Sequence, residues 1–176
     1  MLVVLVGPSG SGKTSVAERL GYPRVLTTTT RLPRPGEVDG KDYHFVSKAQ
    51  FEEGIAKGDF LEHAIVHRNY YGSSKSSIYS ALEASEHATI ILDVHGARAM
   101  RFQSAVQSMD FFLMPPSPWR LHLTRRLMIR GDSPQVIDMR METAEEEIKQ
   151  VGEFDHLIIS DDIDRMVAEI KQCISK

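Results

Sequence analysis

Short apolar runs recur along the chain and alternate with amphipathic segments. Such runs predict strands buried on both faces of a sheet, where side chains show no polar alternation. They cover residues 1–6, 89–93, 109–114 and 156–159. Strands separated by helices imply a parallel sheet with helices on both faces and a ligand site at the carboxyl edge of the sheet. The pattern therefore predicts an α/β fold of three layers.

Helical spacing and capping residues predict the helices. One helix is expected over 13–20, one over about 48–57 behind the capping box of Ser47 and Gln50, and one over 74–83. Further helices should begin at Ser117-Pro118, at Ser133-Pro134 and after Asp161-Asp162. We interpret the apolar stripes of the last two as core: Ile137, Met141, Ala144, Ile148 and Val151, and then Ile163, Met166, Val167, Ile170 and Ile174.

A strand-rich segment interrupts this alternation. Short strands are expected over 24–27, 43–46, 60–66 and 68–71, around a structured loop over 28–41 that is rich in Thr, Arg, Pro and Gly. We therefore expect an inserted region over roughly residues 31–77.

Composition narrows the class of protein. A chain of 176 residues is most simply one domain and buries about 70% of its unfolded surface. The 21 basic and 24 acidic residues leave no excess of positive charge, which argues against nucleic-acid binding. A lone cysteine, Cys173, cannot form an internal disulfide, which suits a reducing compartment. We expect it to be a small buried side chain on the last helix. With no apolar stretch near 20 residues and an N-terminal run that lacks a basic leader, we expect a cytoplasmic protein without a membrane anchor.

The first apolar run leads directly into Gly7-Pro-Ser-Gly-Ser-Gly-Lys-Thr14, which fits the phosphate-loop pattern G-x-x-x-x-G-K-[ST]. Glycines let the backbone turn its N–H groups toward phosphate at the start of a helix, where the helix dipole favours anions. We expect Lys13 to reach the β- and γ-phosphates and the Thr14 hydroxyl to bind Mg²⁺. The full set expected to bind a nucleoside triphosphate is Gly7, Pro8, Ser9, Gly10, Ser11, Gly12, Lys13, Thr14 and Ser15.

A second group of residues points to a phosphorylated acceptor. Arg31 and Arg34 lie three apart beside Pro33 and Pro35, and guanidinium groups bind phosphate bidentately. Glu62 interrupts an apolar strand. A carboxylate accepts hydrogen bonds from two adjacent donors, and guanine offers such a pair at N1–H and N2–H₂. Adenine has an acceptor at N1 and no 2-amino group, so a buried carboxylate would reject it. Solvated surface arginines and an exposed strand glutamate are the alternative interpretations.

These segments resemble the guanylate kinase family. The resemblance rests on Gly7–Thr14, Thr27–Phe45, Gly58–Glu62, Asn69–Ser73 and Arg126–Arg140, in order over nearly the whole chain. It implies transfer of the γ-phosphate of ATP to GMP with Mg²⁺, in a phosphate-loop NTPase fold. It also implies a kinase core over residues 1–30, 78–125 and 141–176, a GMP-binding insertion over 31–77 and a lid over 126–140. The residues expected to bind GMP are Arg31, Arg34, Tyr43 and Tyr71 at the phosphate, Thr27, Glu62 and Ser73 at the base, and Asp93.

The expected chemistry needs no general base, because a phosphate monoester is largely a dianion at neutral pH. Lys13, Arg31, Arg126, Arg130 and Arg140 should supply positive charge to a loose transition state, and the insertion and lid should close over both nucleotides. Asp93 is a candidate Mg²⁺ ligand, with helix capping as its alternative role. Arg126 and Arg140 have the alternative of forming salt bridges along a helix.

The chain departs from the family pattern in several places. The segment Asp93-Val-His95-Gly96 is two residues shorter than usual, and His95 stands where a second aspartate is expected. The sequence therefore does not decide which contacts this segment makes with ribose or metal. The segment after the first helix is also shorter than usual. Thr27 replaces a common serine, and Ser160 stands where asparagine is common, so adenine contacts can differ.

Three alternatives to a guanylate kinase follow from the residues. They are a related small-molecule kinase, such as a ribose-bisphosphate kinase, a guanylate-kinase-like binding module and a weakly active paralogue that binds GMP. We expect a monomer or homodimer with GMP and ATP as its small-molecule partners.

Overall fold

The computed structural model describes residues 1–34, 36–66, 68–103 and 105–175. The chain forms two compact units. Unit one comprises Met1–Val3 with Tyr22–Ser108, and unit two comprises Val4–Gly21 with Met109–Lys176. Among the described residues, no helix is both long and apolar enough to cross a bilayer.

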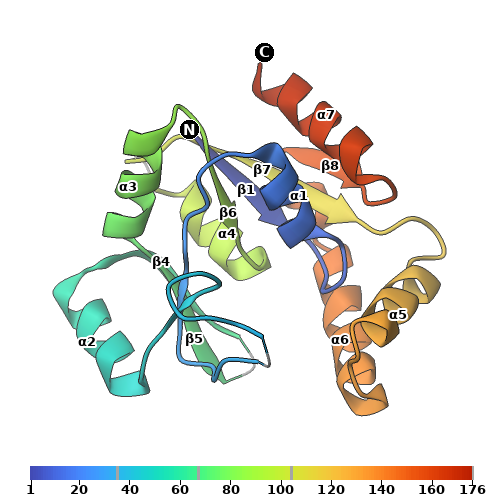
Figure 1. The fold of residues 1–176 in the computed structure, drawn as a ribbon, viewed down its shortest axis with the longest axis horizontal. Coiled ribbons are helices and arrows are strands. Elements are labelled where there is room, and N and C mark those ends of the chain that lie inside the picture. Colours follow the sequence, from blue (N-terminus) through green and yellow to red (C-terminus); the bar gives the residue numbers. More distant parts are fainter. Residues whose placement is uncertain (35, 67, 104, 176) are drawn as a thin grey trace. The chain divides into compact units, whose positions relative to one another are not determined.

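The apolar runs form a four-stranded sheet in the order β6-β1-β7-β8 (Figure 1). Its strands are β1 (Leu2–Val6), β6 (Ala88–Ile91), β7 (Ser108–Met114) and β8 (His156–Ile159). All five residues of β1 are buried, as the absence of polar alternation predicts. β7 and β8 pair in parallel, with Phe111 opposite His156. The expected α/β architecture is confirmed.

Unit two adds four helices: α1 (Lys13–Leu20), α5 (Trp119–Ile129), α6 (Pro134–Ile148) and α7 (Ile163–Ile174). The stripe on α6 is core, since Ile137, Met141 and Ala144 pack with Leu123 and Leu127 of α5. Ser133 caps α6 ahead of Pro134, as expected.

Four expectations for these helices are wrong in detail. Pro118, not Ser117, is the N-cap of α5. Val151 lies in a separate 3₁₀ turn, Val151–Glu153, because α6 ends at Ile148. Ile163 is 42% exposed, because the first turn of α7 precedes the part of the helix that packs through Met166, Val167 and Ile170. Cys173 is half-buried, so it is less enclosed than expected.

Unit one contains a second sheet in the order β3-β2-β5-β4. Its strands are β2 (Thr28–Thr29), β3 (His44–Phe45), β4 (Phe60–Val66) and β5 (Asn69–Ser74). β4 and β5 form an antiparallel hairpin, and β2 pairs with β5 on one side and β3 on the other. The strand expected over 24–27 is wrong: pairing begins at Thr28, and Arg24 forms only an isolated bridge with Thr89.

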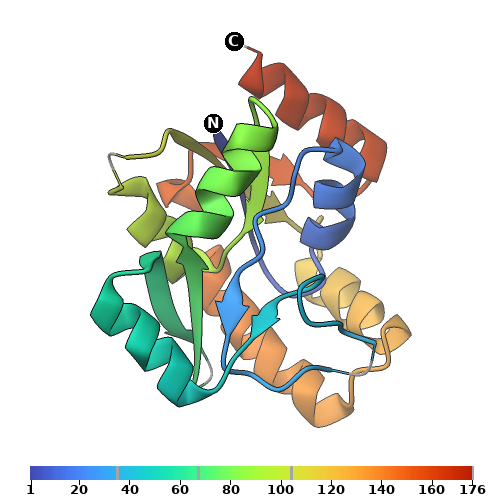
Figure 2. The same ribbon diagram turned by 60° about the vertical axis from the view of Figure 1, so that its left-hand side comes forward.

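Three helices complete unit one: α2 (Lys48–Lys57), α3 (Lys75–Ala84) and α4 (Val94–Arg101). The capping box of Ser47 and Gln50 is present at α2. Figure 2 shows α2 lying along the β4–β5 hairpin, where Phe51 stacks on Phe60 with 4.3 Å between ring centroids. Helix α4 was not expected from the sequence. β6 stops before Asp93, which caps α4 instead of extending the strand.

Candidate active site

The phosphate loop of unit two has the backbone that its glycines allow. Gly7, Gly10 and Gly12 have φ of 135°, 90° and 86°, in the region that L side chains rarely adopt. A Cβ on Gly7 would lie 2.6 Å from the carbonyl oxygen of Leu113, so space as well as conformation requires glycine there. Gly12 is the N-cap of α1, which places the loop at the positive end of that helix.

Polar groups of the loop are held in place within unit two. The Lys13 ammonium donates to the carbonyl oxygens of Gly7 at 2.6 Å and Pro8 at 2.9 Å. Ser11 is fully buried, and its carbonyl oxygen accepts from the Ser160 hydroxyl at 2.7 Å. Thr14 and Ser15 are exposed on the first turn of α1. The nine residues expected to bind ATP are therefore one contiguous loop and helix start.

The three arginines expected in the lid reach this loop. Arg126 donates to the Ser160 hydroxyl at 2.7 Å, to the Ser160 carbonyl oxygen at 2.6 Å and to the Gly10 carbonyl oxygen at 3.1 Å. Arg140 donates to the Ser9 hydroxyl, and Arg130 lies 3.4 Å from the same oxygen. The hydrogen bonds of Arg126 go to main-chain and Ser160 oxygens, and Arg130 and Arg140 meet at Ser9. Their role in phosphate transfer stays a prediction.

In unit one, a β-bulge decides which way Glu62 points. Phe60 pairs with Ser74 but Glu62 pairs with Ser73, so the register shifts between them. Residues two apart normally share a face, and an extra residue reverses that parity. Phe60 therefore packs on α2, while Glu62 joins Ser73 on the opposite face. Because Thr28 is opposite Gly72, alternation also places Thr27 on the Glu62 side.

Glu62 is a buried carboxylate with a defined partner. It is 5% exposed, and the Ser73 hydroxyl donates to its Oε1 at 2.5 Å. The pKa of the Glu62 carboxyl is raised to about 7: burial is the main cause, the hydrogen bonds from Ser73 lower the pKa, and the charge of Asp93 raises it. A Cβ on Gly96 of α4 would lie 3.1 Å from Glu62 Oε2, so the glycine keeps this carboxylate uncrowded.

The phosphate group of residues assembles around Arg31. Its guanidinium carbon lies 5.4 Å from the ring centroid of Tyr43, and the Tyr43 and Tyr71 rings meet edge-on at 6.2 Å. Burial raises the pKa of the Tyr43 hydroxyl above its ordinary value, and Tyr71 adds to the shift. The structure thus brings Arg31, Tyr43 and Tyr71 together, as the sequence led us to expect.

Glu37 holds Arg31 and was given no role by sequence reasoning. Arg31 Nη1 and Nη2 donate to Glu37 Oε2 and Oε1, each at 2.9 Å, and the Arg34 main-chain N–H donates to Oε2 at 2.7 Å. Burial lowers the pKa of Arg31, but Glu37 and Tyr71 outweigh it and the net shift is upward. Burial likewise raises the pKa of Glu37, but Arg31 and Arg34 bring it below its ordinary value. The sequence does contain a signal for this pair, because Glu37 is an acidic residue that lies six positions after Arg31 and directly follows Gly36.

This pairing leaves one edge of the guanidinium for a ligand. Arg31 Nε is buried and has no hydrogen-bond partner among the described residues. Buried donors are rarely left unpaired in folded proteins, so this N–H beside two tyrosines is a candidate position for binding an anion.

Other expected residues lie less clearly in the site. The Arg34 side chain is exposed, so only its main chain joins the Arg31–Glu37 cluster. Pro35, expected to stiffen the arginine pair, lies outside the described residues. Asp93 Oδ1 accepts from the Gly96 N–H at 2.8 Å, which is the capping alternative. His95 is exposed on the first turn of α4.

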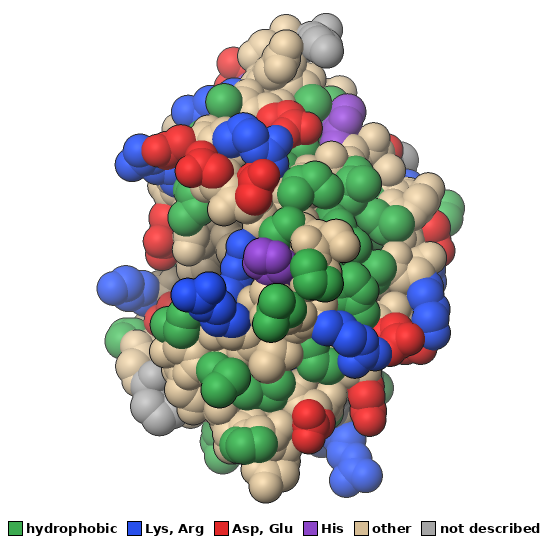
Figure 3. Space-filling view, turned by 90° about the vertical axis from the view of Figure 1, so that its right-hand side faces the viewer, with side chains coloured by type: hydrophobic (Ala, Val, Ile, Leu, Met, Phe, Trp, Pro, Cys, Tyr) green, Lys and Arg blue, Asp and Glu red, His purple; other side chains and the backbone are tan. Residues whose placement is uncertain are grey.

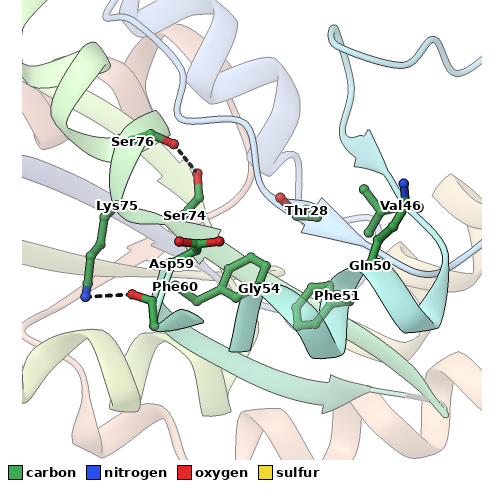
Figure 4. A pocket seen from close by; sticks show the side chains of 11 residues that line it. Thr28, Val46, Gln50, Phe51, Gly54, Asp59, Phe60, Ser74, Lys75 and Ser76 are labelled. Carbon is green, nitrogen blue, oxygen red and sulfur yellow. Dashed lines mark hydrogen bonds between the residues drawn. The ribbon is translucent and has the colours of Figure 1, made fainter. Parts of the chain in front are cut away.

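A cavity of about 550 Å³ opens on the other face of the second sheet, beside α2 (Figure 4). Phe51, Phe60 and Asp59 line it, and Lys75 closes one side by donating to the Gly58 carbonyl oxygen at 2.7 Å. None of the residues expected to bind GMP lines it, so the bulge at Leu61 separates Glu62 from this space.

A glycine-rich phosphate loop after β1 in unit two, and a buried carboxylate and a tyrosine-flanked arginine in unit one, are typical of a phosphate-loop kinase. The guanylate kinase family model matches residues 1–176. A guanylate kinase of Alkalilimnicola ehrlichii is 42% identical over 176 residues, covering 97% of this chain and 85% of that protein. One of Caulobacter vibrioides is 40% identical, covering 97% and 82%. The crystal structure of guanylate kinase from Anaplasma phagocytophilum superposes with a TM-score of 0.79 at 27% identity, covering 99% and 84%.

The chain belongs to the guanylate kinase family. With that membership it is a nucleoside monophosphate kinase, an ATP:GMP phosphotransferase. The family resemblance, the fold class and the enzyme class expected from the sequence are therefore confirmed.

Proposed function

We propose that this chain uses the Glu62 face of unit one to bind GMP and the phosphate loop of unit two to bind ATP, and transfers the γ-phosphate to give ADP and GDP. The observation that carries the GMP assignment is the buried Glu62 carboxylate beside Ser73. Guanine presents N1–H and N2–H₂ side by side, and an ionised carboxylate accepts from both. Adenine presents an acceptor at N1, which would leave the carboxylate facing a lone pair.

The acceptor phosphate fits the Arg31 cluster. Its Nε–H would donate to a phosphate oxygen while Glu37 holds the two Nη groups from the other side. The hydroxyls of Tyr43 and Tyr71 would complete the site, and Arg34 would reach it from the exposed end of the loop. Thr27 and Ser73 would join Glu62 at the base, and Asp93, the N-cap of α4, would add a further contact to GMP.

Transfer then depends on position and charge. The GMP phosphate is already a nucleophile as a dianion, so no residue has to remove a proton. Lys13 and the lid arginines Arg126, Arg130 and Arg140, together with Arg31, would oppose the charge that spreads over the transferred phosphoryl oxygens. Residues 126–140 would act as the lid, 31–77 as the GMP-binding insertion, and 1–30, 78–125 and 141–176 as the core.

The residues present fit a Mg²⁺ that is bound with ATP. Mg²⁺ keeps several waters and takes one or two protein oxygens besides the phosphates, so a dedicated cage is not needed. Among the described residues, no cluster of three His, Cys, Asp or Glu side chains forms such a cage. The exposed Thr14 hydroxyl, next to Lys13, would hold the ion, and Asp93 is the second candidate. When bound, Mg²⁺ neutralises charge on the β- and γ-phosphates.

A nucleotide panel tests the proposal. ADP release would be measured with ATP and each of GMP, AMP, UMP and a ribose bisphosphate. Turnover with GMP at least 100-fold above the others is expected from the donor pattern, since a site built for hydrogen bonds rejects analogues lacking them by about 10⁴. Preference for the ribose bisphosphate would favour the related small-molecule kinase. GMP binding with little or no ADP release would favour the weak paralogue or the binding module.

The remaining expectations concern partners and location. We propose a cytoplasmic enzyme with GMP and ATP as partners, without nucleic acid or membrane, as a monomer or homodimer. Hydrophobic side chains gather on the face shown in Figure 3, and exposed apolar residues of unit two include Met128 and Ile129 of α5 and Leu157 of β8. Such surfaces are where self-association is found, so light scattering after gel filtration would decide between monomer and dimer.

A further inference from the structure

The turn between α5 and α6 contains an acidic residue, Asp132, whose main chain is held by hydrogen bonds of the turn. Arg130 is the C-cap of α5, and Gly131 follows with φ of 88°. The Gly131 N–H donates to the Met128 carbonyl oxygen at 2.9 Å, and the Asp132 N–H donates to the Leu127 carbonyl oxygen at 3.1 Å. These two bonds are the Schellman arrangement that closes a helix. Ser133 and Pro134 then start α6, so the main chain at Asp132 is fixed on both sides.

The Asp132 carboxylate lies between two arginines that come from different helices. Its Oδ2 accepts from Arg130 Nη2 and lies 3.5 Å from Arg140 Nε. Asp132 and Arg140 are both largely buried, with side chains 17% and 14% exposed, while Arg130 is 43% exposed. Burial strengthens these interactions relative to a surface ion pair.

The same two arginines meet at the phosphate loop. Arg140 Nη1 donates to the Ser9 hydroxyl, and Arg130 Nη2 lies 3.4 Å from that oxygen. Two guanidinium groups directed at one hydroxyl repel each other, and like charges side by side are unfavourable without a counter-ion. Asp132 supplies that counter-ion, because its Oδ2 lies against both guanidinium groups.

We propose that Asp132 is a positioning residue for phosphoryl transfer: it holds Arg130 and Arg140 side by side at Ser9 before ATP binds. The proposal rests on the role given above to these arginines and extends it to a residue that touches neither substrate. Preorganised charge is effective because no reorganisation is needed when charge develops, and a misplacement of about 1 Å can lower a rate about 100-fold.

Steady-state kinetics of two variants tests this. Asp132→Ala should lower kcat about 100-fold, and Asp132→Asn, which keeps an acceptor but loses the charge, about 10-fold. KM for GMP should stay within about twofold of the wild-type value, because every residue proposed to bind GMP belongs to unit one. Glu145→Ala is the matched control: it removes an ion pair between α6 and Arg120 of α5, for which the described residues show no contact with the phosphate loop. Its kcat should not change.

A double-variant cycle separates positioning from simple stabilisation. If Asp132 acts through the arginines, Asp132→Asn should lower kcat much less when Arg140→Lys is already present. Additive effects, an unchanged kcat, or a kcat that falls only in step with the melting temperature would overturn the inference. A higher kcat in Asp132→Asn would also overturn it, since Asp132 would then restrain the arginines. If Arg140→Lys and Arg130→Lys themselves leave kcat unchanged, the proposed role of the arginines fails instead.

Discussion

Replacement of Glu62 by glutamine tests the GMP site most directly. The change keeps the shape and one acceptor oxygen, but it removes the charge and puts an amide N–H₂ where the second carboxylate oxygen was. In the ligand-free protein the Ser73 hydroxyl can still donate to the remaining oxygen, so the fold should tolerate the change. A bound guanine would meet one acceptor and one donor in place of two acceptors.

The size of the effect follows from the burial of this residue. Hydrogen bonds to a charged group contribute about 1.5–3 kcal/mol each, and a buried donor left unpaired costs a further amount of similar size. At 5% exposure, water cannot replace the lost partner. A loss of about 3 kcal/mol is therefore expected in the transition-state complex, or roughly a 150-fold fall in kcat/KM for GMP.

The assay is coupled ADP release at pH 8, where a carboxyl with a pKa of about 7 is ionised before GMP binds. Affinity for a non-hydrolysable ATP analogue should stay unchanged, because the phosphate loop belongs to unit two. Glu53→Gln on α2 is the matched control, since it makes the same change at an exposed residue that forms an ion pair with Lys57 at 2.7 Å. Equal losses for GMP and the ATP analogue, or a loss below threefold for GMP, would refute the assignment of Glu62 to the base.

Three more outcomes follow from the same unit. Burial raises the folded-state pKa of Glu62 from 4.5 to about 7, so the stability it confers is present below pH 4.5 and lost as the pH rises through 7. Glu62→Gln should consequently raise the free energy of unfolding of the ligand-free protein by about 3 kcal/mol at pH 8 and by little at pH 4. Unfolding in urea at the two pH values measures this, and an equal effect at both would contradict the raised pKa. Gly96→Ala places a methyl group 3.1 Å from both Glu62 Oε2 and Asp93 Oδ1, so KM for GMP should rise about tenfold. The higher helix propensity of alanine should offset part of any loss of stability. An unchanged KM would show that the two carboxylates move aside. Glu37→Gln breaks the bidentate hold on Arg31 and should raise KM for GMP about tenfold without changing affinity for ATP; a lower KM would mean that Glu37 competes with the GMP phosphate.

Features made by neighbouring residues could be predicted from the sequence. Strand β1, the glycine loop and helix α1 follow one another without interruption, so their backbone preferences alone place the phosphate loop. The capping box at Ser47 and the Ser133-Pro134 start of α6 are also contained within a few residues. Short-range preferences of this kind do not depend on how the rest of the chain packs.

The helix after Asp93 shows where local reasoning fails. Asp93 ends an apolar run, and the sequence allows it to be a Mg²⁺ ligand or a helix cap but predicts no helix over 94–101; in the structure its carboxylate accepts from the Gly96 N–H and starts α4. Val94-His95-Gly96 carries weak helix formers and a glycine, so its propensity for helix is low. Packing of α4 over the Glu62 face overrides it, and the space for that packing depends on Gly96.

Partners far apart in the chain could not be predicted. The sequence contains Glu62 as a base-reading candidate, but the bulge at Leu61 decides which face it occupies, because a shift of one residue reverses every side chain on a strand. Likewise, Arg130 and Arg140 are 121 and 131 residues from Ser9, and only the packing of α5 and α6 brings them to its hydroxyl, with Asp132 in contact with both. Residue types and local spacing thus specify the two anion sites of this protein, while strand register and helix packing specify which charged groups hold them in position.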